Sequence, residues 1–192
     1  MSVDFFTTYS LPSRDGYFWT LTTRLGEILR LIENMYGPRD HSWTILGIEF
    51  NIDPEAYPQI WYPGNCKNIA IQLCGSALND MDIACYQLAH EAIHLLAPLG
   101  GRNANALEEG LATYFSLWYV NEHLGKNVRC NSPSYLKAYE KVGELFAIDA
   151  DAIKKLRCIE PYFYKMTPET FVSAGINVSD TLKNELVFKF NR

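Results

Sequence analysis

The chain opens with a helical pattern of apolar residues. Between residues 16 and 36 they recur every three or four positions, which places them on one face of an amphipathic helix. Ser13 or Asp15 could cap its start, and the Gly-Pro pair at Gly37 predicts its end. Residues 1–15 are expected to be an irregular lead-in. The apolar stripe comprises Phe18, Leu21, Leu25, Ile28, Leu29, Ile32 and Met35.

Three short runs rich in β-branched and aromatic residues come next. They cover residues 43–52, 59–62 and 68–73 and are separated by turn residues, which is typical of strands. The connections are too short for crossover helices, and this favours a small antiparallel or mixed sheet.

The rest of the chain returns to helical patterns. Asn79 or Asp80 could cap a helix that ends near residue 97, with Asp82 close to its positive end. Further helices are predicted at residues 105–123, 133–146, 149–158 and from 167 to just before 175. Residues 186–190 alternate apolar and polar side chains, so a terminal strand or an ordered tail is expected there.

These elements predict an α+β fold with one domain spanning residues 1–192. Its sheet-bearing N-terminal half is expected at about residues 1–78 and its helical remainder at about residues 79–192. The length suits a single domain. A content of 48% hydrophobic and 20% charged residues is typical of a soluble globular protein.

The charge and the cysteine content limit which binding partners and which cellular compartment are expected. The net charge is −5 and no cluster of lysine and arginine occurs, so no nucleic-acid partner is expected. No apolar run approaches the roughly 20 residues that span a bilayer. No secretory signal is evident, and no membrane partner is expected. The five cysteines are odd in number and lack a C-x-x-C pair, which favours reduced thiols in a cytoplasmic protein.

The helix predicted to begin at residue 80 carries His90-Glu91-x-x-His94, an H-E-x-x-H motif. Residues four apart lie about 40° apart around a helix and about 6 Å along it, so both imidazoles can bind one metal ion. Glu91 lies about 100° from His90 and can face a water on that ion without being a ligand. Their neighbours are apolar, where charged groups are costly unless paired. The alternative is a surface helix with two unrelated histidines.

A catalytic zinc site has three protein ligands and one open position. The next predicted helix offers two glutamates, and helical geometry separates them. Glu109 lies opposite the bulky face, among small residues that allow a close approach to the motif helix. Glu108 lies at the edge of the bulky face and is expected to cap the helix, to be solvated or to support a ligand. We expect Glu109 to be the third ligand. Thr113, one turn later, could orient a ligand or simply pack.

The pattern His90-Glu91-x-x-His94 followed by Glu109-Gly-x-Ala resembles the gluzincin group of zinc metallopeptidases, which includes the thermolysin-like and zinc aminopeptidase families. The resemblance implies a compact, zincin-like metallopeptidase core with one zinc ion per chain. It also implies that His90, His94 and Glu109 are the metal ligands and that Glu91 is the general base.

The resemblance covers residues 43–124 and implies an edge strand that binds substrate backbone, for which residues 68–73 are the candidate. Two features depart from the group. Only 14 residues separate His94 from Glu109, and the G-x-M-E-N stretch with which aminopeptidases bind a substrate amino terminus is missing. These departures favour an endopeptidase of narrow specificity that acts on a peptide or protein substrate.

The chemistry implied is zinc-dependent hydrolysis of peptide bonds. Zinc lowers the pKa of its bound water toward about 7 and holds the developing oxyanion. Glu91 accepts the water's proton and delivers it to the leaving amine. Tyr162 and Tyr164 are candidates for a further oxyanion donor. His123 is expected as a basic residue at a helix end, and His41 at an exposed turn.

Two other kinds of function remain open from the sequence. One is a non-catalytic, zinc-stabilised metallopeptidase-fold protein that acts as a binding or regulatory module. The other is a metal-free protein whose aromatic surface binds a partner. In the peptidase interpretation, the C-terminal region near residues 162–164 could restrict access to the site.

Overall fold

The computed structural model describes residues 7–10, 18–64, 66–99 and 104–191. Strand β1, Thr7–Ser10, pairs antiparallel with β2, Phe18–Thr20, where the sequence predicted a lead-in and the start of a helix. Helix α1 covers Leu21–Tyr36 and is capped by Thr20, whose side chain accepts a hydrogen bond from the Thr23 amide. The predicted caps Ser13 and Asp15 lie outside the described residues.

The main sheet has three strands: β3, Thr44–Asn51; β4, Gln59–Trp61; and β5, Asn68–Cys74. Their order is β3-β5-β4, with β5 parallel to β3 and antiparallel to β4. The predicted mixed sheet is thus confirmed. The prediction that residues 68–73 form a substrate-binding edge strand is wrong, because β5 is hydrogen-bonded on both sides. Strand β4 borders the larger of the two cavities described below, as does Asn51 at the end of β3.

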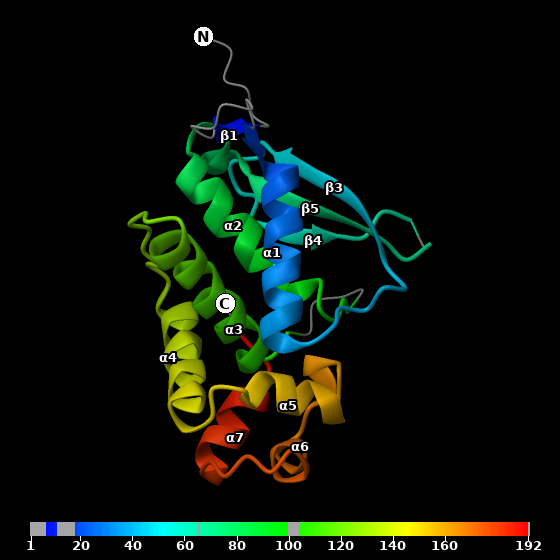
Figure 1. Ribbon diagram of the computed structural model, residues 1–192, viewed down its shortest axis with the longest axis vertical. Coiled ribbons are helices and arrows are strands. Elements are labelled where there is room, and N and C mark those ends of the chain that lie inside the picture. Colours follow the sequence, from blue (N-terminus) through cyan, green and yellow to red (C-terminus); the bar gives the residue numbers. More distant parts are fainter. Residues whose placement is uncertain (1–6, 11–17, 65, 100–103, 192) are drawn as a thin grey trace.

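The helical half contains the predicted helices with shifted ends, together with one that was not predicted (Figure 1). The alternating side chains at 186–190 had predicted a terminal strand or an ordered tail, and the chain is helical up to residue 187. The last described residues form an ordered tail, in which Lys189 makes an antiparallel bridge with Asn105. The helices are α2, Met81–His94; α3, Ala106–Trp118; α4, Pro133–Ile148; α5, Ala152–Ile159; α6, Pro168–Ser173; and α7, Asp180–Val187.

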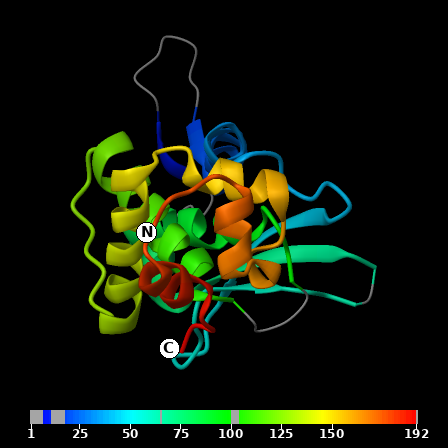
Figure 2. The ribbon, with the colours of Figure 1, turned by 90° about the horizontal axis from the view of Figure 1, so that it is seen from below.

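The buried apolar residues form one cluster between the sheet and the helices. Ile69, Ile71 and Leu73 of β5 are fully buried on the sheet face that packs against α1 and α2. Burial of each such side chain contributes about 1.5–3 kcal/mol. Helix α3 packs between α2 and α4, and α5, α6 and α7 close the lower end of the molecule (Figures 1 and 2).

Arg157 of α5 ties the ends of two helices together. Its guanidinium donates to the carbonyl oxygens of Tyr36, the last residue of α1, and of Gly37 and Pro38, which follow it. It also donates to the carbonyl of Leu96, which follows α2. Burial lowers the pKa of Arg157 to about 10, so the side chain keeps its charge at neutral pH. This contact fixes the turn that immediately follows the H-E-x-x-H motif.

Among the described residues, none of the helices has the length and apolar character needed to cross a membrane. All five cysteines are free thiols.

Candidate metal centre

Helix α2 presents His90 and His94 on the side that faces α3. Asp80 caps this helix, as its position in the sequence indicated, by accepting hydrogen bonds from the amides of Asp82 and Ile83 at 3.0 Å. The helix is almost wholly buried, with His90 only 8% exposed and Glu91 only 4% exposed. Such burial holds the motif in one orientation and leaves its polar groups dependent on partners from neighbouring elements.

Helix α3 supplies the partner that the sequence predicted. Asn105 caps α3 by accepting from the Glu108 amide at 3.0 Å, which places Glu109 in the first turn. Glu109 Oε2 lies 3.2 Å from His90 Nε2 and 3.8 Å from His94 Nε2. The ligand atoms of these three residues all lie within 4.8 Å of one another. Two ligands of a tetrahedral zinc ion are about 3.3 Å apart at normal bond lengths, so the spacing suits such an ion.

Glu108 orients one of the histidines. Its Oε1 lies 2.7 Å from His94 Nδ1, and the glutamate is only 1% exposed. Because a carboxylate accepts hydrogen bonds, His94 donates through Nδ1, and neutral His94 then carries its lone pair on Nε2, the atom near Glu109. Metal-binding histidines commonly have such a carboxylate behind them. Of the three roles expected for Glu108, support of a ligand fits the structure and solvation does not.

Thr113 does not orient the Glu109 carboxylate. Its hydroxyl donates to the backbone carbonyl of Glu109 at 2.8 Å, within the same helix. Gly110 matters for packing on the other side of α3, because a Cβ there would collide with the Ala138 carbonyl of α4 and lie 2.8 Å from Val142 Cγ2. Because Gly110 has no side chain, α4 can pack closely against the side of α3 that faces away from α2.

The donor set combines two histidines with three nearby carboxylates. We call His90, Glu91, His94, Glu108 and Glu109 the two-helix site. Burial lowers the pKa of His94, but the nearby carboxylates, Glu109 first, outweigh it and raise this pKa to about 10. The buried Oε2 of Glu108 accepts no hydrogen bond from a described residue. The two imidazoles, the three carboxylates and the buried Glu108 Oε2 are suitable ligands for a divalent cation. Such a cation would take the place of the proton that the raised pKa puts on His94.

Two cavities meet at this site. One of about 720 Å³ is lined by Glu91, His94 and Glu109 together with strand β4. The other, of about 240 Å³, is lined by His90, Glu91 and Tyr135. Glu91 and Tyr57 line both, which places Glu91 where the cavities join.

The predicted oxyanion donors do not reach these cavities. Tyr162 instead donates to Asp40 at 3.4 Å, and neither Tyr162 nor Tyr164 is among the lining residues. Tyr57 lines both cavities together with Glu91, and Tyr135 lines the smaller one. The Tyr135 ring lies 5.6 Å from that of His90. Sequence reasoning missed both. The one available signal was that Tyr57 lies just before the short strand at 59–62.

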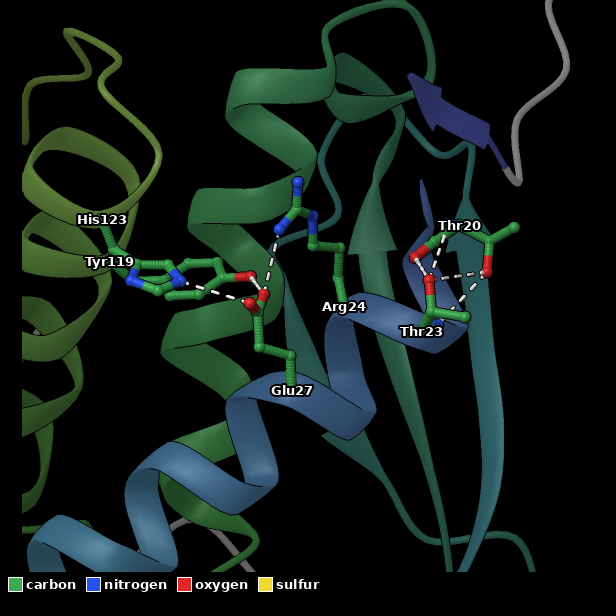
Figure 3. A network of polar contacts seen from close by, with 6 residues as sticks. All are labelled: Thr20, Thr23, Arg24, Glu27, Tyr119 and His123. Atoms are coloured by element: carbon green, nitrogen blue, oxygen red, sulfur yellow. Dashed lines mark hydrogen bonds and ion pairs between the residues drawn. The ribbon is translucent and has the colours of Figure 1, made fainter. Parts of the chain in front are cut away.

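A second polar cluster lies between α1 and the end of α3, and we call it the Glu27 network (Figure 3). Glu27 Oε2 accepts from Tyr119 at 2.6 Å and from Arg24 at 3.0 Å, while Oε1 lies 3.2 Å from His123 Nε2. Burial raises the pKa of Glu27, but these hydrogen bonds outweigh it and the net pKa is lowered. His123, in the π-helical turn Tyr119–His123, is therefore part of this network and not of the two-helix site.

No family model, curated protein or solved structure matches this chain. The assignment of the two-helix site therefore rests on its geometry and chemistry.

Proposed function

We propose that this protein is a gluzincin-like, zinc-dependent peptidase in which His90, His94 and Glu109 hold one zinc ion. The observation that carries the proposal is the convergence of these three donors from two helices, with His94 held by Glu108. Glu91 is the general base.

Zinc, when bound, supplies the Lewis acidity that activates a water and polarises a peptide carbonyl. The protein's own groups perform the proton transfers. Glu91 takes a proton from the water and delivers it to the amine that leaves, which requires a carboxylate that reaches the cleft without binding the metal. Its burial beside the apolar core of α2 holds its position. Glu108 keeps His94 oriented, and Tyr57 and Tyr135 are the nearest candidates for donors to the oxyanion.

The cavities favour an endopeptidase over an enzyme that acts on chain ends. Space continues on both sides of Glu91, so a substrate can extend in both directions from the bond that is cleaved. Strand β4 lines the larger cavity and, among the described residues, pairs with β5 alone, so its other edge is the candidate to bind an extended peptide. The short strand and its neighbouring loop would limit how many substrate residues bind, in keeping with narrow specificity.

The test combines metal analysis with one substitution. Protein purified without chelators should contain one zinc per chain, and it should cleave at least one member of a diverse peptide library. Glu91→Gln keeps the size of the side chain but removes the base, so it should retain zinc and lose cleavage by at least about 100-fold. Absence of zinc would refute the proposal. One zinc per chain without any cleavage would instead identify a zinc-stabilised binding module.

A further inference from the structure

The C-terminal segment of residues 188–190 is attached to the start of α3. Two backbone hydrogen bonds join them, one on each side of the residue that caps this helix. The Ala106 amide donates to the Phe188 carbonyl at 2.9 Å, and the Phe190 amide donates to the Ala104 carbonyl at 3.0 Å. The first turn of α3 also carries the two glutamates that contact the histidines. The C-terminal segment is therefore fixed next to the two-helix site.

The ring of Phe190 connects this segment to α4 and, through α4, to α2. It is half-buried, lines the larger cavity and packs on the ring of Tyr135, with the ring centroids 4.8 Å apart and the planes inclined by 55°. The Tyr135 ring in turn lies 5.6 Å from that of His90, at 66°. Tyr135 thus lies between the C-terminal segment and a proposed metal ligand, and it lines the smaller cavity with His90 and Glu91.

The surrounding structure makes the orientation of the Tyr135 ring depend on Phe190. Aromatic rings about 4.5–7 Å apart with inclined planes attract each other beyond the area that they bury, so the contact favours one orientation. Tyr135 belongs to the first turn of α4. Helix α7, which ends just before the C-terminal segment, packs against both α3 and α4. This packing sets where Phe190 lies relative to Tyr135.

We propose that Phe190 is a positioning residue of the two-helix site, where it holds the Tyr135 ring beside His90 and next to Glu91. This inference rests on the proposed peptidase function and adds a residue that acts through Tyr135. Phe190 is not itself a metal ligand in this proposal. The C-terminal segment then contributes to the site, although it is distant from the H-E-x-x-H motif in the sequence.

NMR spectroscopy tests the positioning without any need for activity. The chain has only four histidines, so labelled histidine and tyrosine rings allow the contact between Tyr135 and His90 to be resolved in the full chain. The nuclear Overhauser effect between these two rings should be lost in Phe190→Ala. Phe188→Ala is the matched control and should retain it, because Phe188 is 66% exposed and lines neither cavity. An effect that persists in Phe190→Ala would overturn the proposal.

Kinetics of the zinc-loaded protein give a second readout. Phe190→Ala should lower kcat for a cleaved peptide by about 3- to 10-fold, because Tyr135 lies beside groups that act on the peptide bond. KM should stay within about twofold. Phe190→Tyr retains an aromatic ring and should restore kcat, and Phe188→Ala should leave it unchanged. A kcat that is unaffected by Phe190→Ala, or that falls equally in Phe188→Ala, would contradict a positioning role.

A double-mutant cycle decides whether Phe190 acts through Tyr135. Tyr135→Leu removes the second ring, so Phe190→Ala should cause no further loss of kcat in that background. Losses that multiply would overturn the proposal. Phe190→Leu keeps an apolar side chain and replaces Phe190→Ala throughout if circular dichroism shows that the alanine variant is unfolded. If no peptide is cleaved, the peptidase proposal fails by its own test, and the NMR comparison still decides the role of Phe190.

Discussion

The two-helix site and the Glu27 network use the same side-chain types but arrange them differently. In the Glu27 network one carboxylate accepts from the cation Arg24, from the Tyr119 hydroxyl and from His123. In the two-helix site the ligand atoms of His90, His94 and Glu109 all lie within 4.8 Å of one another, and Glu108 contacts His94. The first cluster gathers donors around one carboxylate, and the second brings three metal-ligating groups to one point.

This difference bears on the role of each cluster. A carboxylate that has both a cation and a hydroxyl donor stabilises the contact between α1 and the end of α3. Two imidazoles and a carboxylate that converge on one point match the donor set of a zinc site. Histidine beside glutamate is therefore not enough to indicate a metal site, and the convergence of three ligand atoms distinguishes the two clusters.

The largest contrast is expected in zinc binding. Glu109→Ala removes a ligand and should lower zinc affinity by more than the roughly 10- to 100-fold typical of a residue that only supports a ligand. Glu27→Gln should bind zinc as tightly as the unmodified protein. Competition with a chromophoric chelator measures both affinities. Similar losses in the two variants would show that the clusters do not differ in the way described.

The second contrast concerns stability without metal. Glu27→Gln should lower the free energy of unfolding by about 2–3 kcal/mol, because Arg24 and Tyr119 lose their charged acceptor. Tyr119→Phe removes one hydrogen bond and should cost only about 1 kcal/mol. Urea unfolding of the zinc-free proteins measures both values. A Glu27→Gln variant as stable as the unmodified protein would rule out a stabilising role for the network.

A smaller change in zinc affinity is expected when Glu108, which contacts His94 Nδ1, is replaced. Glu108→Gln keeps an oxygen near His94 Nδ1 but removes the charge, so zinc affinity should fall by about 10- to 100-fold with the fold retained. Thr113→Val is the control, since its hydroxyl bonds the Glu109 backbone and not the carboxylate. Chelator competition measures the zinc affinity, and circular dichroism shows whether the fold is retained. A larger loss in the Thr113 variant would contradict this assignment.

The last contrast is the dependence of stability on pH. In the metal-free protein the pKa of His94 is raised from 6.5 to about 10, so protonated His94 stabilises the fold fully below pH 6.5. That contribution should be lost as the pH rises toward 10, and bound zinc should remove it. The lowered pKa of Glu27 acts oppositely, because its contribution is lost as the pH falls below 4.5. Urea unfolding between pH 3 and 10, with and without zinc, checks both directions. A zinc-free protein whose stability does not decline above pH 7 would contradict the assignment at His94.

Local patterns in the sequence were sufficient for most of the helices and for the choice of candidate ligands, but they missed α7. Asp80 and the apolar spacing around the motif predicted α2, and the helical position of Glu109 among small residues predicted which glutamate would face the histidines. These predictions depend on caps and on the helical period, which act within a few residues. Where non-local pairing competes, the patterns were insufficient. Phe18 continued the helical stripe of α1 in the sequence, yet its backbone pairs with β1.

The sequence by itself determined that two histidines and a glutamate could share one metal ion, because a helix repeats its side-chain directions at a fixed spacing. Only the tertiary structure decided that β5 lies in the middle of the sheet, that β4 borders the site, and that Glu108 holds His94. It also showed that His123 contacts Glu27 and is not part of the two-helix site. The physical reason is that side-chain partners and strand order depend on residues distant in the chain, which meet only when the helices and the sheet pack together.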